Sequence, residues 1–176
     1  MKIAMLVLAG ALVAGLCCGC QSLFDVRCRK PGVSTKQAAA NMKRTYDFLK
    51  EAKVYYIATV DCNDQPHVRP FGTINIFEGK LYIQTGRKKH VARQLMANGK
   101  VELCAMKGPR EVLRVTGTLV EDPRREAKAA MLDAYPGLKK MYSPDDANTM
   151  VLYFKPGTVR VTITDNPTTP TVDMMF

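Results

Sequence analysis

The stretch QPHVRPFGTINIFEGKLYIQTGRKKHVARQL, residues 65–95, decides the fold. Its first part carries β-favouring residues up to Ile76, and Phe77–Lys80 has the composition of a turn. Leu81–Thr85 then alternates again, as a half-buried strand does. A basic loop follows, and it opens an apolar-periodic helix. The stretch therefore predicts a strand, a turn, a second strand, a loop and a helix in that order.

The loop between the second strand and the helix contains three adjacent cations, Arg87, Lys88 and Lys89. A helix start offers free backbone N–H groups and the positive end of the helix dipole, and both attract anions. Arg69 on the neighbouring strand is expected to add a fourth cation. Without a ligand these cations oppose the dipole, at a cost of about 0.3–1 kcal/mol each. The pattern therefore favours a phosphate-type ligand over a charged, solvated helix start.

Hydrophobic periodicity in the rest of the chain predicts more strands than helices. Further strands are expected at 54–60, 100–106, 112–120, 150–154 and 159–164, and helices at 35–52, 88–97 and 123–134. Gly117 predicts a bulge or a close backbone approach, and Asp122-Pro123 has the sequence of a helix start. Residues 138–148 are expected to be helical or looped, and the chain end irregular. Sequential strands with one apolar face are typical of an antiparallel barrel or sandwich with attached helices.

The composition is that of a globular protein with 176 residues, 47% hydrophobic and 24% charged, which is enough for one domain and an appendage. The formal net charge of +10 raises the prior for anionic partners. The basic residues are spread along the chain, however, and no stripe interleaves them with aromatic residues. We therefore expect a solvated basic surface and no nucleic-acid partner.

Residues 1–20 have the sequence of a targeting segment. Lys2 precedes the apolar run IAMLVLAGALVAGL, which is short for a membrane span of about 20 residues. The run ends in a cysteine cluster, and a cysteine preceded by glycine resembles a bacterial lipoprotein signal. Cys20 is the expected lipidation site, and Cys17, Cys18 and an uncleaved anchor are the alternatives. The protein is thus expected in the cell envelope, tethered to a membrane and facing away from the cytoplasm.

The remainder divides into a linker at 21–36, a folded domain at 37–165 and a tail at 166–176. Cys28, Cys62 and Cys104 form neither a disulfide framework nor metal-ligand spacing, although a Cys28–Cys62 bridge stays open. His67 and His90 have no carboxylate or cysteine partner at a spacing typical of a catalytic triad or a metal site. We expect no bound metal.

Four segments resemble the flavin-binding split-barrel proteins related to pyridoxamine 5'-phosphate oxidase, in their small nitroimidazole-resistance-like branch. They read YYIATVDCNDQPHVRPFGTINIFEGKLYIQTG, RKKHVARQL, VELCAM and LRVTGTLVEDPRREAKAAML, within residues 42–155. The order of the elements matches the family as well as the words do. The resemblance implies an antiparallel split β-barrel with FMN as cofactor, bound at the subunit interface of a homodimer.

The resemblance also implies that the flavin ring lies against the first strand of the opening stretch. Arg69 matches the arginine that starts the flavin-contacting strand of the family. Pro70, Phe71 and Gly72 follow it, and they would place backbone against the isoalloxazine ring.

The flavin phosphate is implied to lie at the start of the helix. Thr85 and Gly86 match the end of the second strand, near the ribityl chain and the phosphate, and Lys88 and Lys89 match the Arg-Lys pair at the phosphate. Physical chemistry points the same way, because a phosphate dianion binds best where charge-assisted donors and a helix N-terminus meet.

The substrate side departs from pyridoxamine 5'-phosphate oxidase itself. That enzyme uses a basic residue just past the flavin strand and a C-terminal arginine–histidine pair, whereas this chain has Ile74 and ends TVDMMF. Oxidase activity on the vitamin is therefore not expected. A flavin still permits hydride or electron transfer between an electron donor and a small molecule. We expect a membrane-tethered FMN oxidoreductase, with a non-catalytic flavin- or haem-binding module of the same fold as the alternative.

Overall fold

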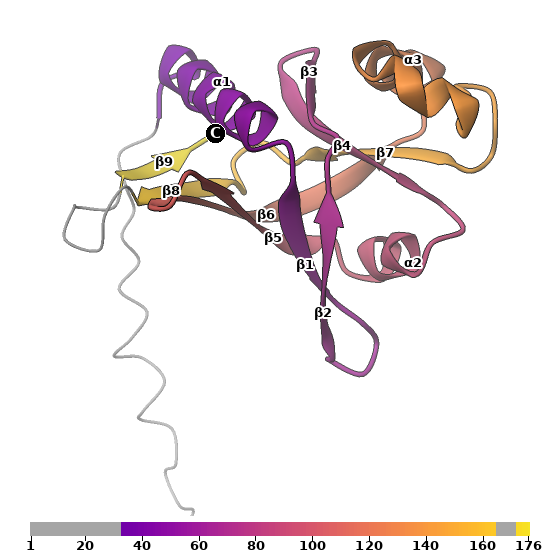
Figure 1. The fold of residues 1–176 in the computed structure, drawn as a ribbon, viewed down its shortest axis with the longest axis horizontal. Helices are drawn as coiled ribbons and strands as arrows, with labels where there is room; N and C mark the ends of the chain where they lie inside the picture. The colour runs from indigo at the N-terminus through magenta and orange to yellow at the C-terminus, as the bar shows by residue number, and fades with distance from the viewer. Residues whose placement is uncertain (1–32, 165–171) are drawn as a thin grey trace, which may run out of the picture. The chain divides into compact units, whose positions relative to one another are not determined.

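One antiparallel sheet organises the computed structural model, which describes residues 33–164 and 172–176 (Figure 1). In chain order the elements are α1 (Thr35–Ala52), β1 (Tyr55–Val60), β2 (Pro66–Phe71), β3 (Asn75–Phe77), β4 (Lys80–Gly86), α2 (His90–Ala97), β5 (Lys100–Lys107), β6 (Glu111–Asp122), α3 (Arg125–Ala134), the 3-10 helix η1 (Pro136–Lys140), β7 (Thr149–Phe154), β8 (Arg160–Thr164) and β9 (Val172–Met175). The strand order is β2-β1-β5-β6-β7-β4-β3, with β8 on β6 and β9 on β8. This confirms the predicted mainly β, antiparallel fold with attached helices.

The long strand β6 changes partner along its length, and this lets the sheet curl. One edge of β6 pairs with β5. The other edge pairs with β8 over Val112–Thr116 and with β7 over Leu119–Asp122. Gly117 lies at the change, and a Cβ there would sit 2.9 Å from Cδ1 of Phe154. Gly117 thus permits a close approach, although the approaching group is the Phe154 side chain and not the backbone that the sequence predicts.

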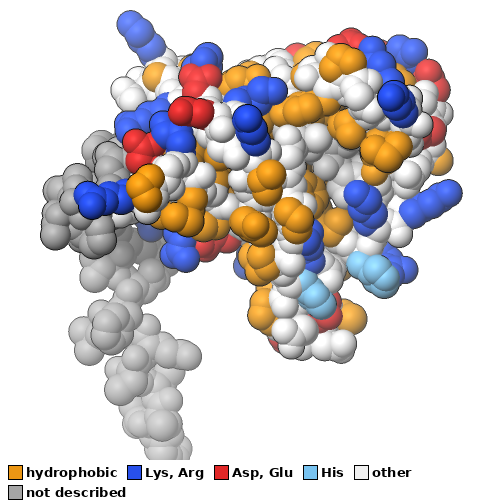
Figure 2. Space-filling view, in the orientation of Figure 1, with side chains coloured by type: hydrophobic (Ala, Val, Ile, Leu, Met, Phe, Trp, Pro, Cys, Tyr) orange, Lys and Arg blue, Asp and Glu red, His pale blue; other side chains and the backbone are white. Residues whose placement is uncertain are grey.

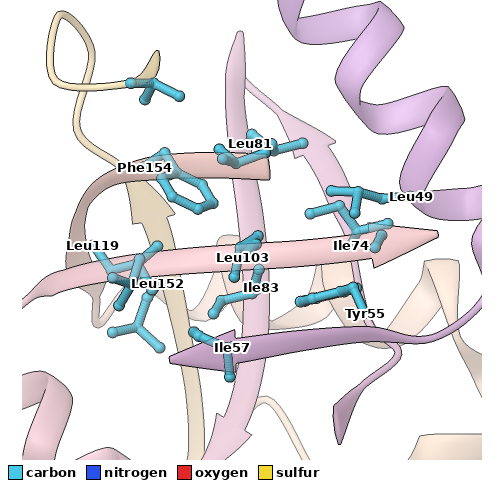
Figure 3. Packing of buried hydrophobic residues seen from close by; sticks show 14 of the residues in the cluster. Leu49, Tyr55, Ile57, Ile74, Leu81, Ile83, Leu103, Leu119, Leu152 and Phe154 are labelled. Atoms are coloured by element: carbon cyan, nitrogen blue, oxygen red, sulfur yellow. The ribbon is translucent and has the colours of Figure 1, made fainter. Parts of the chain in front are cut away.

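The curled sheet encloses a core of aliphatic and aromatic side chains (Figure 3). The residues labelled there come from α1, five strands and the segment before β3: Leu49, Tyr55, Ile57, Ile74, Leu81, Ile83, Leu103, Leu119, Leu152 and Phe154. A smaller cluster joins Tyr82 and Val151 to Ala127 and Met131 of α3. Strands β4 and β7 are therefore covered on both faces, and burial of each large apolar side chain contributes about 1.5–3 kcal/mol.

Helix α1 begins where the sequence predicts. The hydroxyl of Ser34 accepts a hydrogen bond from the N–H of Gln37 at 3.2 Å and caps the helix start. The last turn ends at Lys53, whose φ of 63° turns the chain toward β1. Helix α1 then lies across β5 and β9, as Figure 1 shows.

The single strand expected before the turn at 77–80 is in fact two strands, because β2 ends at Phe71 and β3 begins only at Asn75. The helix start expected at Asp122-Pro123 is also wrong. Asp122 ends β6, and its carboxylate accepts hydrogen bonds from the Tyr82 hydroxyl at 2.9 Å and from Arg124. Helix α3 consequently begins two residues beyond the proline.

The chain end departs from the expected irregular tail, because residues 172–175 form β9 on the outer edge of β8. An unpaired edge strand exposes its backbone N–H and C=O groups, and β9 satisfies those of β8. Met174 is 6% exposed and joins the core. The predicted targeting segment, with Cys20, lies outside the described residues, and no helix within them is long and apolar enough to cross a membrane.

Replacing Gly117 with alanine should lower the free energy of unfolding by about 1–3 kcal/mol, because the added methyl group overpacks against the buried ring of Phe154. Urea denaturation measures the change. Gly137→Ala is the matched control, since nothing lies within 4 Å of a Cβ at Gly137, and it should change stability by less than about 0.5 kcal/mol. Equal effects in the two variants would contradict close packing at Gly117.

Candidate functional site

A pocket of about 370 Å³ lies where the two edges of the sheet approach each other, and we call it the edge pocket. Its volume is in the range of small-molecule sites, about 300–1,000 Å³. Strand β2 forms one edge of the sheet, and β4 forms the other beyond its pairing with β3. Six of the eight predicted cofactor residues line the edge pocket: Arg69, Pro70, Phe71, Gly72, Thr85 and Lys89.

Hydroxyl groups, rather than strand pairing, hold the chain between β2 and β3. Thr73 Oγ1 accepts from the N–H of Gln84 at 3.2 Å and donates to the Gln84 carbonyl at 3.3 Å. The Tyr55 hydroxyl donates to the Thr73 carbonyl at 2.7 Å. The Tyr135 hydroxyl accepts from the N–H of Ile74 at 2.9 Å and donates to its carbonyl at 3.0 Å. These bonds satisfy the backbone where the sheet stops, and they keep the edge pocket open.

Arg69 is a half-buried cation whose partners are all neutral. Its Nη1 donates to Thr59 Oγ1 at 2.5 Å and to the Ile57 carbonyl at 3.4 Å, and its Nη2 donates to Gln94 Oε1 at 2.7 Å. Burial lowers the pKa of the guanidinium. No carboxylate among the described residues contacts it, so the charge is uncompensated. A buried charge without a counterion is costly, and an anionic ligand would relieve that cost.

The basic loop lies in the turn before α2, because the helix begins at His90, two residues later than expected. Figure 2 shows Lys, Arg and His side chains gathered at the surface near α2. Arg87 pairs with Glu121. Lys88 and Lys89 are exposed and have no ion-pair partner within the described part of the chain. Of the three adjacent cations, these two remain for an anion.

Backbone groups of the basic loop are used within the protein. Asn148 accepts from the N–H of Arg87 at 2.7 Å through its carbonyl and from the N–H of Lys88 at 3.1 Å through Oδ1. The N–H of Lys89 bonds the Gly86 carbonyl at 3.0 Å. The N–H groups of the first two residues of α2 have no partner in the described residues. An anion at the helix start would therefore bind these two groups, not the loop amides.

The segment that carries Asn148 is anchored by Asp146. The carboxylate accepts from the N–H groups of Ser143 at 2.8 Å, Asn148 at 2.9 Å and Thr149 at 2.5 Å. Burial alone would raise the pKa of Asp146, but these hydrogen bonds outweigh it and lower the pKa to about 2. Within the segment expected to be helical or looped, Asp146 therefore holds the support of the basic loop.

Gly86 and Lys88, the two remaining predicted residues, do not line the edge pocket. Gly86 lies behind it, because a Cβ there would sit 3.0 Å from the Tyr142 hydroxyl. This close approach lets Tyr142 form part of the pocket wall. The structure therefore gives Gly86 a packing role next to the pocket and places Lys88 in the exposed loop.

Two buried polar side chains at the edge pocket lack partners. The amide of Gln84, on a residue 5% exposed, and the hydroxyl of Thr85, on a residue 3% exposed, make no hydrogen bond within the described residues. Leaving such a group unsatisfied costs about 1–3 kcal/mol. These atoms have almost no accessible surface, so a ligand in the pocket would reach them only after a shift of the side chains that cover them.

Apolar side chains complete the wall of the edge pocket. Val91 of α2 and Leu138 of η1 line it, together with Met141, which is 66% exposed. With Phe71 of β2 they form a surface suited to a flat aromatic group, while the cations lie toward α2. The arrangement therefore fits a ligand with an aromatic part and an anionic part.

Neither histidine of the chain lines the edge pocket. The expectation that His67 lacks a carboxylate partner is wrong, because the β1–β2 turn places its Nε2 2.9 Å from Asp61 Oδ2. The hydrogen bond from His67 lowers the pKa of Asp61. His90 Nδ1 lies 2.5 Å from Arg93 Nη2. No group of three metal-ligating side chains occurs among the described residues.

Sequence reasoning missed the residues that support the predicted ones. Thr59 and Gln94 hold Arg69, and Thr73 and Tyr135 hold the chain beside the ring-contacting segment. The β1–β2 hairpin pattern was a usable signal for Thr59, since it lies diagonally across the hairpin from Arg69, and diagonal neighbours in an antiparallel pair face the same side. Nothing in the sequence pattern indicated that Gln94 of α2 and Tyr135, just after α3, would contribute.

The chain is similar to a known protein family and to several solved structures. It matches the family model described as pyridoxamine 5'-phosphate oxidase over residues 42–163. It is similar to the structure of a NimC/NimA family protein from Clostridium acetobutylicum, with 39% identity and a TM-score of 0.75, over 81% of this chain and 96% of that one. No curated protein matches its sequence.

Two more distant structures share the fold. One is a heme binding protein from Mycobacterium smegmatis, with 15% identity and a TM-score of 0.59, over 83% of this chain and 59% of that one. The other is the heme storage protein HutZ from Vibrio cholerae, with 16% identity and a TM-score of 0.54, over 69% of this chain and 93% of that one. Identities this low establish a common fold alone.

Replacing Asp146 with asparagine should destabilise the protein at neutral pH, because the charge that holds three backbone N–H groups is lost. The folded pKa, about 2, lies below the usual Asp value of about 3.9. The stabilisation is therefore present above about pH 4 and is lost as the pH falls toward 2. Denaturation curves for wild type and variant should converge over that interval.

Asp64→Asn is the matched control for this measurement. Asp64 is exposed in the β1–β2 turn at a φ of 60°, a conformation that asparagine tolerates well. It should show no comparable pH-dependent difference from wild type. A constant gap between wild type and Asp146→Asn from neutral pH down to about pH 2 would contradict the assigned role.

Proposed function

The chain belongs to the pyridoxamine 5'-phosphate oxidase-like split-barrel family, in its nitroimidazole-resistance-like branch, and on this premise we propose that it binds FMN in the edge pocket and transfers electrons to a small molecule. One observation carries the proposal. The uncompensated cations Arg69 and Lys89 line the same pocket as the unpartnered polar side chains of Gln84 and Thr85. An anionic ligand with polar groups along its length answers both features.

The flavin phosphate would lie at the start of α2. Lys88 and Lys89, together with Arg69 of β2, would supply charge, and the two free N–H groups of the helix start would supply directed hydrogen bonds. Asn148 holds the loop backbone in place for them. Charge-assisted bonds of this kind are about twice as strong as neutral ones.

The isoalloxazine ring would lie against the ends of β2 and the wall formed by η1. Pro70 and Gly72 offer backbone without bulky side chains, and a Cβ at Gly72 would come within 3.3 Å of the Lys53 carbonyl. Phe71 and Leu138 would exclude water from the ring, and Gln84 and Thr85 would lie beside its polar edge or the ribityl hydroxyls. When bound, FMN supplies the hydride or electron chemistry, and the protein binds and orients it.

Flavin suits the edge pocket better than haem does. The names of two structural relatives make haem the second candidate for this fold. Histidine and cysteine are common haem ligands, and neither residue type lines the pocket in the described part of the chain. A haem protein would instead have to use Met141 or Tyr142. An intense haem absorption band in the purified protein would favour this second candidate.

A homodimer would complete the site. The outer face of β1, β2 and β5, with Val54 just before β1, exposes large apolar side chains: Val54 is 49%, Tyr56 52%, Val68 65% and Met106 57% exposed. Figure 2 shows hydrophobic side chains gathered over β1 and the adjoining part of β5. Pro70, which lines the edge pocket, pairs with Tyr56 across β1 and β2, so the apolar face continues into the pocket.

A contiguous apolar face of this kind marks an interaction surface, and a second copy would cover it and close the pocket. Sedimentation of the purified protein tests the dimer. A monomer at all accessible concentrations would contradict it.

We further propose a tether to the membrane of the cell envelope through a lipid on Cys20. The apolar run and the Gly19-Cys20 junction support this proposal. Metabolic labelling with radioactive palmitate should mark the protein, and Cys20→Ala should abolish the label. Persistent labelling of that variant would shift the acceptor to Cys17 or Cys18.

Lys89→Glu should abolish FMN retention, because it reverses one of the two free cations of the basic loop. Flavin absorbance of the purified protein after reconstitution with FMN provides the measurement. The wild type should show flavin absorbance that bleaches with a nicotinamide donor. Lys155→Glu, which makes the same charge change in the exposed turn between β7 and β8, should retain FMN like wild type. Colourless wild-type protein that cannot be reconstituted would defeat the flavin proposal.

A further inference from the structure

We infer that Gln94 is a positioning residue, which holds Arg69 without neutralising it and thereby makes the edge pocket select ligands that carry a phosphate. The inference deepens the proposed function and rests on it. Gln94 lies on α2, does not itself line the pocket, and belongs to neither the predicted ring-contacting nor the phosphate-contacting residues.

Gln94 and Thr59 together hold one end of the Arg69 guanidinium group. Gln94 Oε1 accepts from Arg69 Nη2 at 2.7 Å and from Thr59 Oγ1 at 2.7 Å. The Thr59 hydroxyl in turn accepts from Arg69 Nη1 at 2.5 Å. The two partners are thus bonded to each other and to the two terminal nitrogens of the arginine. This closed triangle fixes the plane of the guanidinium.

These contacts leave two N–H donors of Arg69 free for a ligand. Three hydrogen bonds engage the terminal nitrogens, and the Nε–H and one Nη2–H of Arg69 have no partner in the described residues. These two N–H groups form a parallel pair, the arrangement in which arginine binds two oxygens of a phosphate or carboxylate. Because Arg69 lines the edge pocket, an anion in the pocket can meet this pair.

The amide at position 94 matters because it is neutral. A glutamate would accept the same two hydrogen bonds, with nearly the same shape, and would also form an ion pair with Arg69. The pair would cancel the charge that an anionic ligand requires. A neutral acceptor instead orients the cation and leaves its charge uncompensated. Gln94 therefore contributes selectivity for an anion rather than affinity for every part of a ligand.

The test compares FMN with riboflavin, which has the same ring and ribityl chain but no phosphate, on purified full-length protein. Gln94→Glu should weaken FMN binding about tenfold or more, the loss expected when one charged hydrogen bond is cancelled, and should change riboflavin binding less than about twofold. The thermal midpoint of the ligand-free variant should be equal to or above that of wild type. A merely structural role of Gln94 would move both affinities together.

Two further variants sharpen the result. Gln94→Met removes the acceptor without adding charge, and it should weaken FMN binding less than Gln94→Glu does. A larger loss in Gln94→Met would overturn the inference, because shape and not charge would then dominate. Gln37→Glu, another helical glutamine on α1, adds the same negative charge away from the edge pocket, and FMN binding should match wild type.

Inorganic pyrophosphate separates failure of this inference from failure of the proposed function. If wild type binds neither flavin, the flavin proposal fails. Thermal stabilisation by pyrophosphate then decides the role of Gln94, and it should be present in wild type and reduced in Gln94→Glu. Equal stabilisation in both proteins, none in wild type, or parallel losses of FMN and riboflavin binding would each overturn the inference.

Discussion

The site depends on one constraint: the two edges of the sheet meet but do not pair. Backbone N–H and C=O groups at a buried sheet edge need partners, and a continuous strand would have provided them. Here Thr73, Tyr55 and Tyr135 provide them through their hydroxyls. Because hydroxyl groups reach across a wider gap than a paired strand leaves, the edges stay apart. The edge pocket is the space that remains where hydroxyl groups take the place of a paired strand.

The same principle shapes the electrostatics of the pocket. The acidic groups near the site are already engaged, Glu121 with Arg87 and Asp146 with backbone N–H groups. Arg69 and Lys89 are thus left without carboxylate partners among the described residues. A protein that compensated these cations internally would gain some stability and would lose attraction for an anion. Because Arg69 and Lys89 have no carboxylate partner among the described residues, the site favours binding of an anionic ligand over ion pairs within the protein.

Sequence periodicity could predict the strands and the helices, because burial of one face per element imposes it. It could also predict Arg69 and Lys89, since their place on a strand and beside a helix start follows from local pattern. It could not predict the break at 72–74, because β-favouring Ile74 continues the pattern and the hydroxyls that hold the break come from distant elements. The helix start predicted at Asp122-Pro123 is wrong for a related reason. Local sequence assigns the Asp122 carboxylate to a helix cap, but it accepts hydrogen bonds from Tyr82 and Arg124 instead.

The chain end has a consequence for how the protein folds. Asn41 on α1 donates to the Met175 carbonyl at 2.9 Å across 134 residues, and the N–H of Gly157 bonds the Phe176 carbonyl at 3.2 Å. Helix α1 therefore cannot complete its contacts until residue 175 is in place, far along the chain. Contacts between the two ends of a chain form slowly and late. Closure of α1 against β9 is therefore expected to be a late step in the folding of this domain.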